Sequence, residues 1–159
     1  MREGDLYADI CRGAMSQEWL LYRLTEGINK APADLAGINP CGTGVLVEVK
    51  KIAAEKKTKG DERFPWRLFS PHQITWMQRY VGTGGISIAL LYDEVARVMS
   101  AYLLNIHNFP NGTMTNISDM DVIILTLDKS SHCWLGWNII HLLWTHKLES
   151  DTQPDTSLQ

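Results

Sequence analysis

Residues 31–52 read APADLAGINPCGTGVLVEVKKI, and this pattern predicts a β-hairpin. A short apolar segment containing Asp34 leads into a turn rich in Asn, Pro and Gly, the residues that favour turns. The β-branched run 45–52 follows and is typical of a strand. Because side chains alternate along a strand, Glu48 and Lys50 would face one side while the neighbouring valines face a core. The hairpin would bring Asp34 back beside Glu48.

Two carboxylates and an ammonium group meeting at such a hairpin suit phosphodiester hydrolysis. Asp34 and Glu48 offer the hard oxygen ligands that Mg²⁺ prefers. A bound Mg²⁺ would acidify a water and neutralise the charge of a phosphodiester. Lys50 would orient the attacking water or stabilise the charge that builds on phosphorus. The alternative is a half-buried strand with a solvated ion pair, because E-x-K occurs by chance in many strands.

Further motifs lie on both sides of this hairpin, over about half of the chain. They read RGAMSQE at 12–18, PADLAGI at 32–38, VEVKK at 47–51, FPWRLFSPHQITWM at 64–77 and GGISIALLY at 84–92. Together they resemble the PD-(D/E)xK nuclease superfamily, and within it the Holliday junction resolvases of the archaeal Hjc and bacterial RecU types. One departure from the family pattern is that Ala33, not proline, precedes Asp34.

This resemblance implies an α/β domain of the restriction-endonuclease-like type, with a central mixed β-sheet flanked by α-helices. It implies a Mg²⁺-dependent endonuclease, with Mn²⁺ able to substitute, that resolves four-way DNA junctions. A homodimer is expected, because two active sites are needed to cut two strands symmetrically. The expected site consists of Asp34 and Glu48 as metal ligands, the carbonyl of Val49 as an extra ligand, Lys50 as the catalytic lysine, and Glu18 and Gln73 completing the site.

Two other readings of the function stay open. The first is another nuclease of the same superfamily, of the VRR or restriction type, acting on flaps or ordinary duplex. The second is a non-catalytic DNA-binding module that keeps the fold, although the intact Asp34, Glu48 and Lys50 favour catalysis. Glu18 has a structural alternative too, as a carboxylate in the first turn of a helix that begins near Ser16.

The charge distribution is more informative than the net charge of −3. Residues 50–67 carry five Lys and two Arg against three acids, a local charge of +4 on an otherwise acidic chain. A local basic patch suits contact with phosphates, although a solvated charged loop would give the same pattern. The candidate DNA-binding residues are Arg12, Lys51, Lys56, Lys57, Lys59, Arg63 and Arg67.

Length and composition indicate one globular domain over residues 1–148, with a disordered tail at 149–159. Three cysteines, an odd number without C-x-x-C spacing, favour a reducing cytoplasm over a zinc site. That compartment would belong to a bacterial, archaeal or phage-infected cell. No apolar run reaches the length of a membrane span.

The remaining pattern predicts the order of the elements. Apolar spacing favours a helix over 5–26 with a break near Gly13, and Ser16 would cap a new start there. The family resemblance implies a strand at 64–69. Other expected elements are a helix from Ser70 or Pro71 to Tyr80, a central strand at 86–92, a strand or helix at 95–104, a strand at 122–127 and a helix at 134–148.

Overall fold

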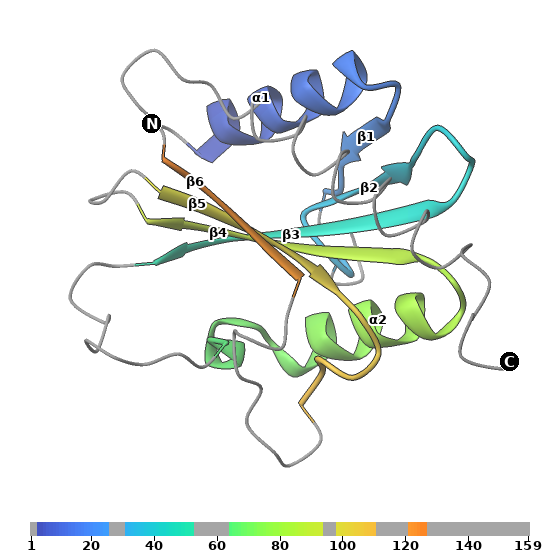
Figure 1. Ribbon diagram of the computed structural model, residues 1–159, viewed down its shortest axis with the longest axis vertical. Coiled ribbons are helices and arrows are strands. Elements are labelled where there is room, and N and C mark those ends of the chain that lie inside the picture. The colour runs from blue at the N-terminus through green and yellow to red at the C-terminus, as the bar shows by residue number, and fades with distance from the viewer. Residues whose placement is uncertain (1–2, 26–30, 53–63, 94–97, 111–120, 127–159) are drawn as a thin grey trace, which may run out of the picture.

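A computed structural model describes residues 3–25, 31–52, 64–93, 98–110 and 121–126. Their two α-helices lie on opposite sides of one β-sheet, so the described part has three layers (Figure 1). In chain order the elements are α1 (Glu3–Ser16), β1 (Leu20–Arg23), β2 (Leu35–Ile38), β3 (Gly44–Ile52), the 3-10 helix η2 (Trp66–Leu68), α2 (Pro71–Gly82), β4 (Ile86–Asp93), β5 (Val98–Leu104) and β6 (Asp121–Thr126). The expected α/β class with a mixed, helix-flanked sheet is confirmed.

The sheet is mixed, and among the described residues its strands lie in the order β1-β2-β3-β4-β5-β6. Every neighbouring pair is antiparallel except β3 and β4, which run parallel. Parallel neighbours require a crossover connection, and α2 lies within the one that joins β3 to β4. The predicted hairpin is confirmed, since Leu35 pairs with Val47 and Ile38 with Gly44.

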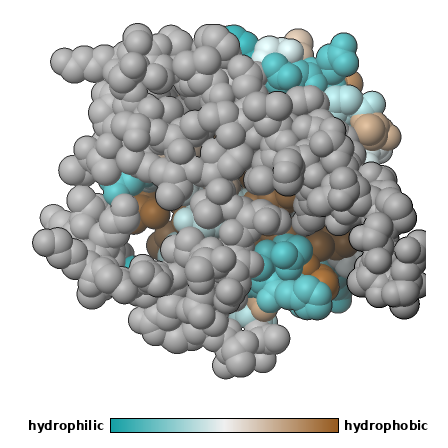
Figure 2. Space-filling model, viewed as in Figure 1, coloured by the Kyte–Doolittle hydropathy of each residue, from teal (hydrophilic) through white to brown (hydrophobic). Residues whose placement is uncertain are grey.

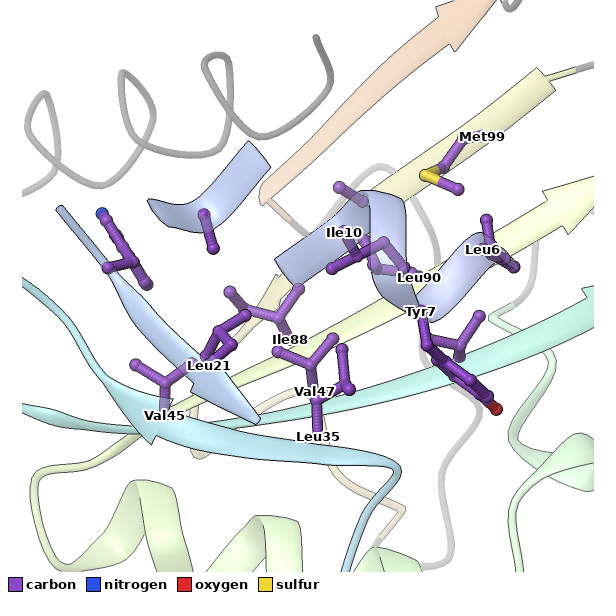
Figure 3. Close-up of a cluster of buried hydrophobic side chains, with 14 of the residues drawn as sticks. Leu6, Tyr7, Ile10, Leu21, Leu35, Val45, Val47, Ile88, Leu90 and Met99 are labelled. Carbon is purple, nitrogen blue, oxygen red and sulfur yellow. The ribbon is translucent and has the colours of Figure 1, made fainter. Parts of the chain in front are cut away.

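One face of the sheet packs against α1 through a cluster of buried apolar side chains. Leu6 and Ile10 of the helix point toward Val47, Ile88 and other residues of the strands (Figure 3). The alternating valines of β3 all belong to this cluster, as their spacing predicts. In the space-filling view, hydrophobic residues are visible near the middle of the molecule, next to hydrophilic ones (Figure 2).

The helix α2 begins where the sequence predicts. Ser70 is its N-cap and Pro71 its first residue, and the Ser70 side chain and Gln73 form a reciprocal capping box. Met77 is fully buried against the sheet, with Ile74 and Val81 partly buried beside it. On the side toward β2, Tyr80 packs against Ala33, Ala36 and Leu46. The capping box and this packing fix where the first turn of α2 lies over the sheet.

The predicted helix over 5–26 is wrong beyond Ser16. There α1 ends with the Ser16 hydroxyl donating to the carbonyl of Gly13, rather than capping a new helix. Glu18 has a left-handed backbone (φ 62°) in the turn that leads into β1. Within β1 burial alternates, since Leu21 is buried while Leu20 and Tyr22 are exposed, and pairing with β2 outweighs the apparent helical spacing.

Other expectations have mixed outcomes. The segment 64–69 contains the 3-10 helix η2 rather than a strand, because its aromatic rings pack on one another. Residues 98–104 form a strand, with β6 on its far side. The predicted strand at 122–127 corresponds to β6. The expected helix at 134–148 and the tail at 149–159 lie outside the described residues. Neither described α-helix is long and apolar enough to cross a membrane.

Candidate active site

The two predicted carboxylates meet where β2 leaves β3. Asp34 comes directly before β2, and the last paired residues there are Leu35 and Val47, so Asp34 lies opposite Glu48. The Asp34 amide donates to Glu48 Oε2 at 3.2 Å. Asp34 Oδ2 in turn accepts from the amide of Val49 at 2.8 Å. These two bonds hold both carboxylates at the end of the hairpin ladder, as the sequence predicts.

Lys50 and Gln73 complete a closed network around Glu48. Lys50 Nζ lies 2.5 Å from Glu48 Oε1, which also accepts from the side-chain amide of Gln73. Lys50 Nζ donates as well to Gln73 Oε1 at 3.2 Å. The structure thus brings Asp34, Glu48, Lys50 and Gln73 together at one point, from the start of β2, from β3 and from the first turn of α2.

Two residues that sequence reasoning did not assign hold this network in place. The amide of Ser70 donates to Gln73 Oε1 at 3.0 Å, so the capping box leaves the side-chain amide of Gln73 facing Glu48. The ring of Phe69 lies under Lys50, with 5.5 Å from Nζ to the ring centroid. The S-x-x-Q pattern at Ser70 is a capping-box signal and predicts the first contact; no sequence pattern indicates the second.

The carboxyl group of Glu48 is fully buried, and this changes its acidity. Burial, followed by the negative charge of Asp34, raises the pKa of Glu48 from 4.5 to about 7, although contact with Lys50 opposes the shift. Lys50 is 22% exposed and reaches Glu48 from the solvent side. A buried carboxylate next to a second one and a lysine is typical of functional sites.

The donor chemistry of the pair fits a hard divalent cation. Asp34 and Glu48 are close enough for their charges to interact, and a cation between them would relieve that repulsion. In a strand the amide and carbonyl of one residue point to the same edge, so the Val49 carbonyl points toward the Asp34 side. Within the described residues no three His, Cys, Asp or Glu side chains form a metal-binding group; Mg²⁺ often takes one or two carboxylates and keeps its waters.

Glu18 is not brought to this network. It precedes β1 at the end where Leu20 pairs with Ile38, whereas Asp34 lies at the other end of the β1–β2 pair, beyond Arg23 and Leu35. Glu18 is exposed in its turn. Its expected place as a third acid of the site is therefore corrected: the residue that makes this turn lies several residues along the sheet from the carboxylates.

The candidate DNA-binding residues fall into four groups. Arg12 lies on α1, on the other side of the sheet from α2, and forms an exposed ion pair with Asp9 at 3.0 Å. Lys51 is exposed, and strand alternation turns it away from the face of Lys50. Arg67 is exposed in η2, three residues before Ser70. The others, Lys56, Lys57, Lys59 and Arg63, lie outside the described residues.

A scan against models of protein families gives no match to this chain, and a search of the curated proteins gives no match either.

Proposed function

We propose that the protein is a metal-dependent DNA endonuclease with the restriction-endonuclease-like fold, and that its substrates are four-way junctions. The observation that carries this proposal is the meeting of Asp34 and Glu48 where β2 and β3 part, with Lys50 Nζ 2.5 Å from Glu48. A mixed sheet with a helix layer on each side supports the same fold. The choice of four-way junctions as substrates rests on the sequence motifs that resemble the junction resolvases.

Asp34, Glu48 and the carbonyl of Val49 would hold Mg²⁺, or Mn²⁺ in its place. When bound, the metal supplies an acidified water and neutralises charge on the phosphodiester. The chain contributes the position of its ligands. The Val49 amide fixes Asp34 from one side, and the Asp34 amide fixes Glu48 from the other. A bound cation would offset the negative charge of Asp34 and so favour the ionised form of Glu48.

Lys50 and Gln73 lie next to Glu48, where the scissile phosphate of a bound substrate would be. Lys50 provides a cation within reach of the water and the scissile phosphate, where it orients the one and stabilises charge on the other. The side-chain amide of Gln73 donates to Glu48, and its oxygen accepts from Lys50. Gln73 therefore sets the spacing between Glu48 and Lys50. Ser70 keeps that amide from rotating.

Symmetric resolution of a junction needs one cut in each of two strands. A C2 homodimer supplies two copies of this site, and we propose that state for the active protein. The expected basic patch after β3 would contact phosphates near the scissile one without reading bases. Selectivity would then follow the shape of the DNA.

The test is a cleavage assay with labelled four-way, flap and linear duplex DNAs of matched sequence, in Mg²⁺ and in EDTA. We expect paired nicks across the junction in Mg²⁺, little cutting of linear duplex, and none in EDTA. Preferential cutting of flaps or duplex would assign a different nuclease activity to the same site. Binding of junctions without any cleavage in Mg²⁺ or Mn²⁺ would overturn the enzymatic proposal.

A further inference from the structure

Exposed apolar side chains of β1 lie on the same face of the sheet as the carboxylate network. In β1, Leu21 belongs to the cluster under α1, so its neighbours Leu20 and Tyr22 face the opposite side, the side of α2. Both are more than half exposed, Leu20 at 56% and Tyr22 at 60%. Leu24 continues this row and packs against the cluster of Ala33, Ala36 and Leu46 on the α2 side of the sheet, which agrees with that direction. Large exposed apolar groups in one place mark an interaction site.

Tyr22 lies next to Asp34 on this face. Tyr22 pairs with Ala36, and Asp34 is two residues before Ala36, so the two are diagonal neighbours. Such neighbours have side chains roughly 7–8 Å apart, within reach of an aromatic ring. The phenol ring of Tyr22 therefore borders the candidate metal site from the β1 side.

Trp76 borders the site from the other direction. It follows Gln73 by three residues and precedes Tyr80 by four, so it shares a side of α2 with both. That side faces β2, because Tyr80 packs against Ala36 and Leu46. The indole is 44% exposed, with the ring of His72 at 6.3 Å between centroids. Tyr22 and Trp76 thus present aromatic surface on two sides of one pair of carboxylates.

We propose that Tyr22 and Trp76 form a stacking subsite for unpaired nucleobases that flank the scissile phosphate. Every base has a π-face, so stacking on aromatic side chains strengthens binding to any sequence. A continuous duplex keeps its bases stacked inside, whereas branch points and single strands can offer them. The subsite therefore selects DNA that has unstacked bases next to the cut. This inference rests on the proposed nuclease function.

The chain offers a matched control for this subsite. Leu20 and Ile38 are exposed on the same face and pair with each other at the far end of the β1–β2 ladder, away from Asp34. Had the apolar surface been a contact for a second copy of the chain, these two residues would contribute as much as the aromatic ones. If the surface is a base-stacking subsite, only Tyr22 and Trp76 contribute to the affinity for DNA.

The experiment measures DNA binding by fluorescence anisotropy in Ca²⁺, so that it does not depend on cleavage. Ligands are a four-way junction, a single strand and a linear duplex. We expect Tyr22→Ala and Trp76→Ala each to weaken binding of the junction and the single strand roughly 10-fold, with duplex binding unchanged. Tyr22→Phe should retain wild-type affinity, and so should Leu20→Ala and Ile38→Ala. All five variants change one of four exposed residues, and circular dichroism checks their folding.

Three outcomes would overturn the stacking subsite. They are equal losses on duplex and junction, unchanged affinity in both aromatic variants, and losses in Leu20→Ala and Ile38→Ala accompanied by a lower mass in sedimentation. The last would assign the surface to an interface between copies of the chain. Selective losses in a protein that never cleaves DNA would instead support the subsite and overturn the nuclease proposal, so the two failures are distinguishable.

Discussion

The two faces of β3 differ in what they bury. Toward α1 the strand presents Val45, Val47 and Val49, all in one apolar cluster. Toward α2 it presents Leu46, then Glu48 and Lys50 in the same alternating row. Both faces of β3 are covered by a helix. Only the face toward α2 has ionisable side chains, Glu48 and Lys50, among the residues that the helix covers.

This contrast separates residues that stabilise the fold from residues kept at a cost. Burying a carboxylate is unfavourable even when it is paired, and replacing a whole buried ion pair by well-packed apolar residues often leaves a protein as stable or more so. Glu48 is buried, its pKa is raised, and three polar partners surround it. The face toward α1 therefore supports the structure, while the face toward α2 gives up some stability for a function.

The largest expected effect comes from changing the carboxylates. Asp34→Asn should abolish cleavage while junction binding is kept or strengthened, because a ligand charge that repels phosphate is lost. The asparagine oxygen can still accept from the Val49 amide, so the hairpin end is retained. Glu48→Gln should act likewise. Single-turnover cleavage and anisotropy measure the two properties, and a wild-type rate in either variant would exclude the metal-ligand assignment.

On the other face the expectation reverses. Ile88→Ala truncates a side chain that is 1% exposed under α1. It should lower the free energy of unfolding by about 2–5 kcal/mol, since it leaves a cavity, and leave the rate per folded molecule unchanged. Urea unfolding and active-site titration measure these quantities. A large loss of cleavage rate in the folded variant would contradict the assignment of the α1 face to stability alone.

The stability of the metal-free protein should depend on pH through Glu48. Its pKa is about 7 when folded, against 4.5 ordinarily, so the folded state holds the proton more tightly. The contribution is fully present below pH 4.5 and is lost as the pH rises through 7, a change of about 3 kcal/mol. Glu48→Gln should lack this loss.

Urea unfolding in EDTA at pH 5 and pH 8 compares the two proteins. Wild type should lose stability relative to Glu48→Gln between those values. Parallel behaviour of the two would mean that the carboxyl group is ionised at little cost in the folded protein.

A smaller loss is expected from the lysine of the same row. Lys50→Ala should slow cleavage on the order of 10²-fold, the scale for removing one electrostatic stabiliser, with metal binding retained in calorimetry. Lys51→Ala is the matched control, because its side chain faces the other way. At saturating DNA it should cleave at the wild-type rate. An unaffected rate in Lys50→Ala would leave the lysine as an ion-pair partner only.

The smallest effect concerns the basic segment after β3. Replacing Lys56, Lys57, Lys59 and Arg63 together by Ala should weaken binding to every DNA alike and flatten its salt dependence, because fewer counterions are released. Anisotropy titrations at several salt concentrations measure both. Equal affinity and equal slope in the variant would assign DNA contact to other surfaces.

The hairpin, the start of α2 and the central strand were predictable because local chemistry determines them. Asn, Pro and Gly at 39–44 specify the turn, and Ser70 and Pro71 specify the cap. Alternation then places Glu48 and Lys50 on one side. The positions of Asp34, Glu48 and Lys50 follow from these local signals, whereas Gln73 was expected at the site only from the family resemblance.

The segment between α1 and the hairpin was not predictable in the same way. Trp19, Tyr22 and Leu24 fit helical spacing, but the chain turns at Glu18 and pairs with β2 instead. That pairing is a long-range contact, which no local pattern reveals. The same limit applies to the aromatic packing at 64–69 and to the burial of Glu48, which depends on the elements that cover it.

The hydrogen bond between Asp34 and the Val49 amide gives the site a built-in reporter. The Val49 N–H of β3 depends on a carboxylate side chain for its acceptor, where ordinary ladder residues use a carbonyl. If binding of a ligand moves the Asp34 carboxylate away, the Val49 amide loses its acceptor. The rate at which that amide exchanges its hydrogen with solvent then changes. Isotope exchange at Val49, followed residue by residue in NMR spectra, therefore reads the occupancy of the site without substrate or turnover.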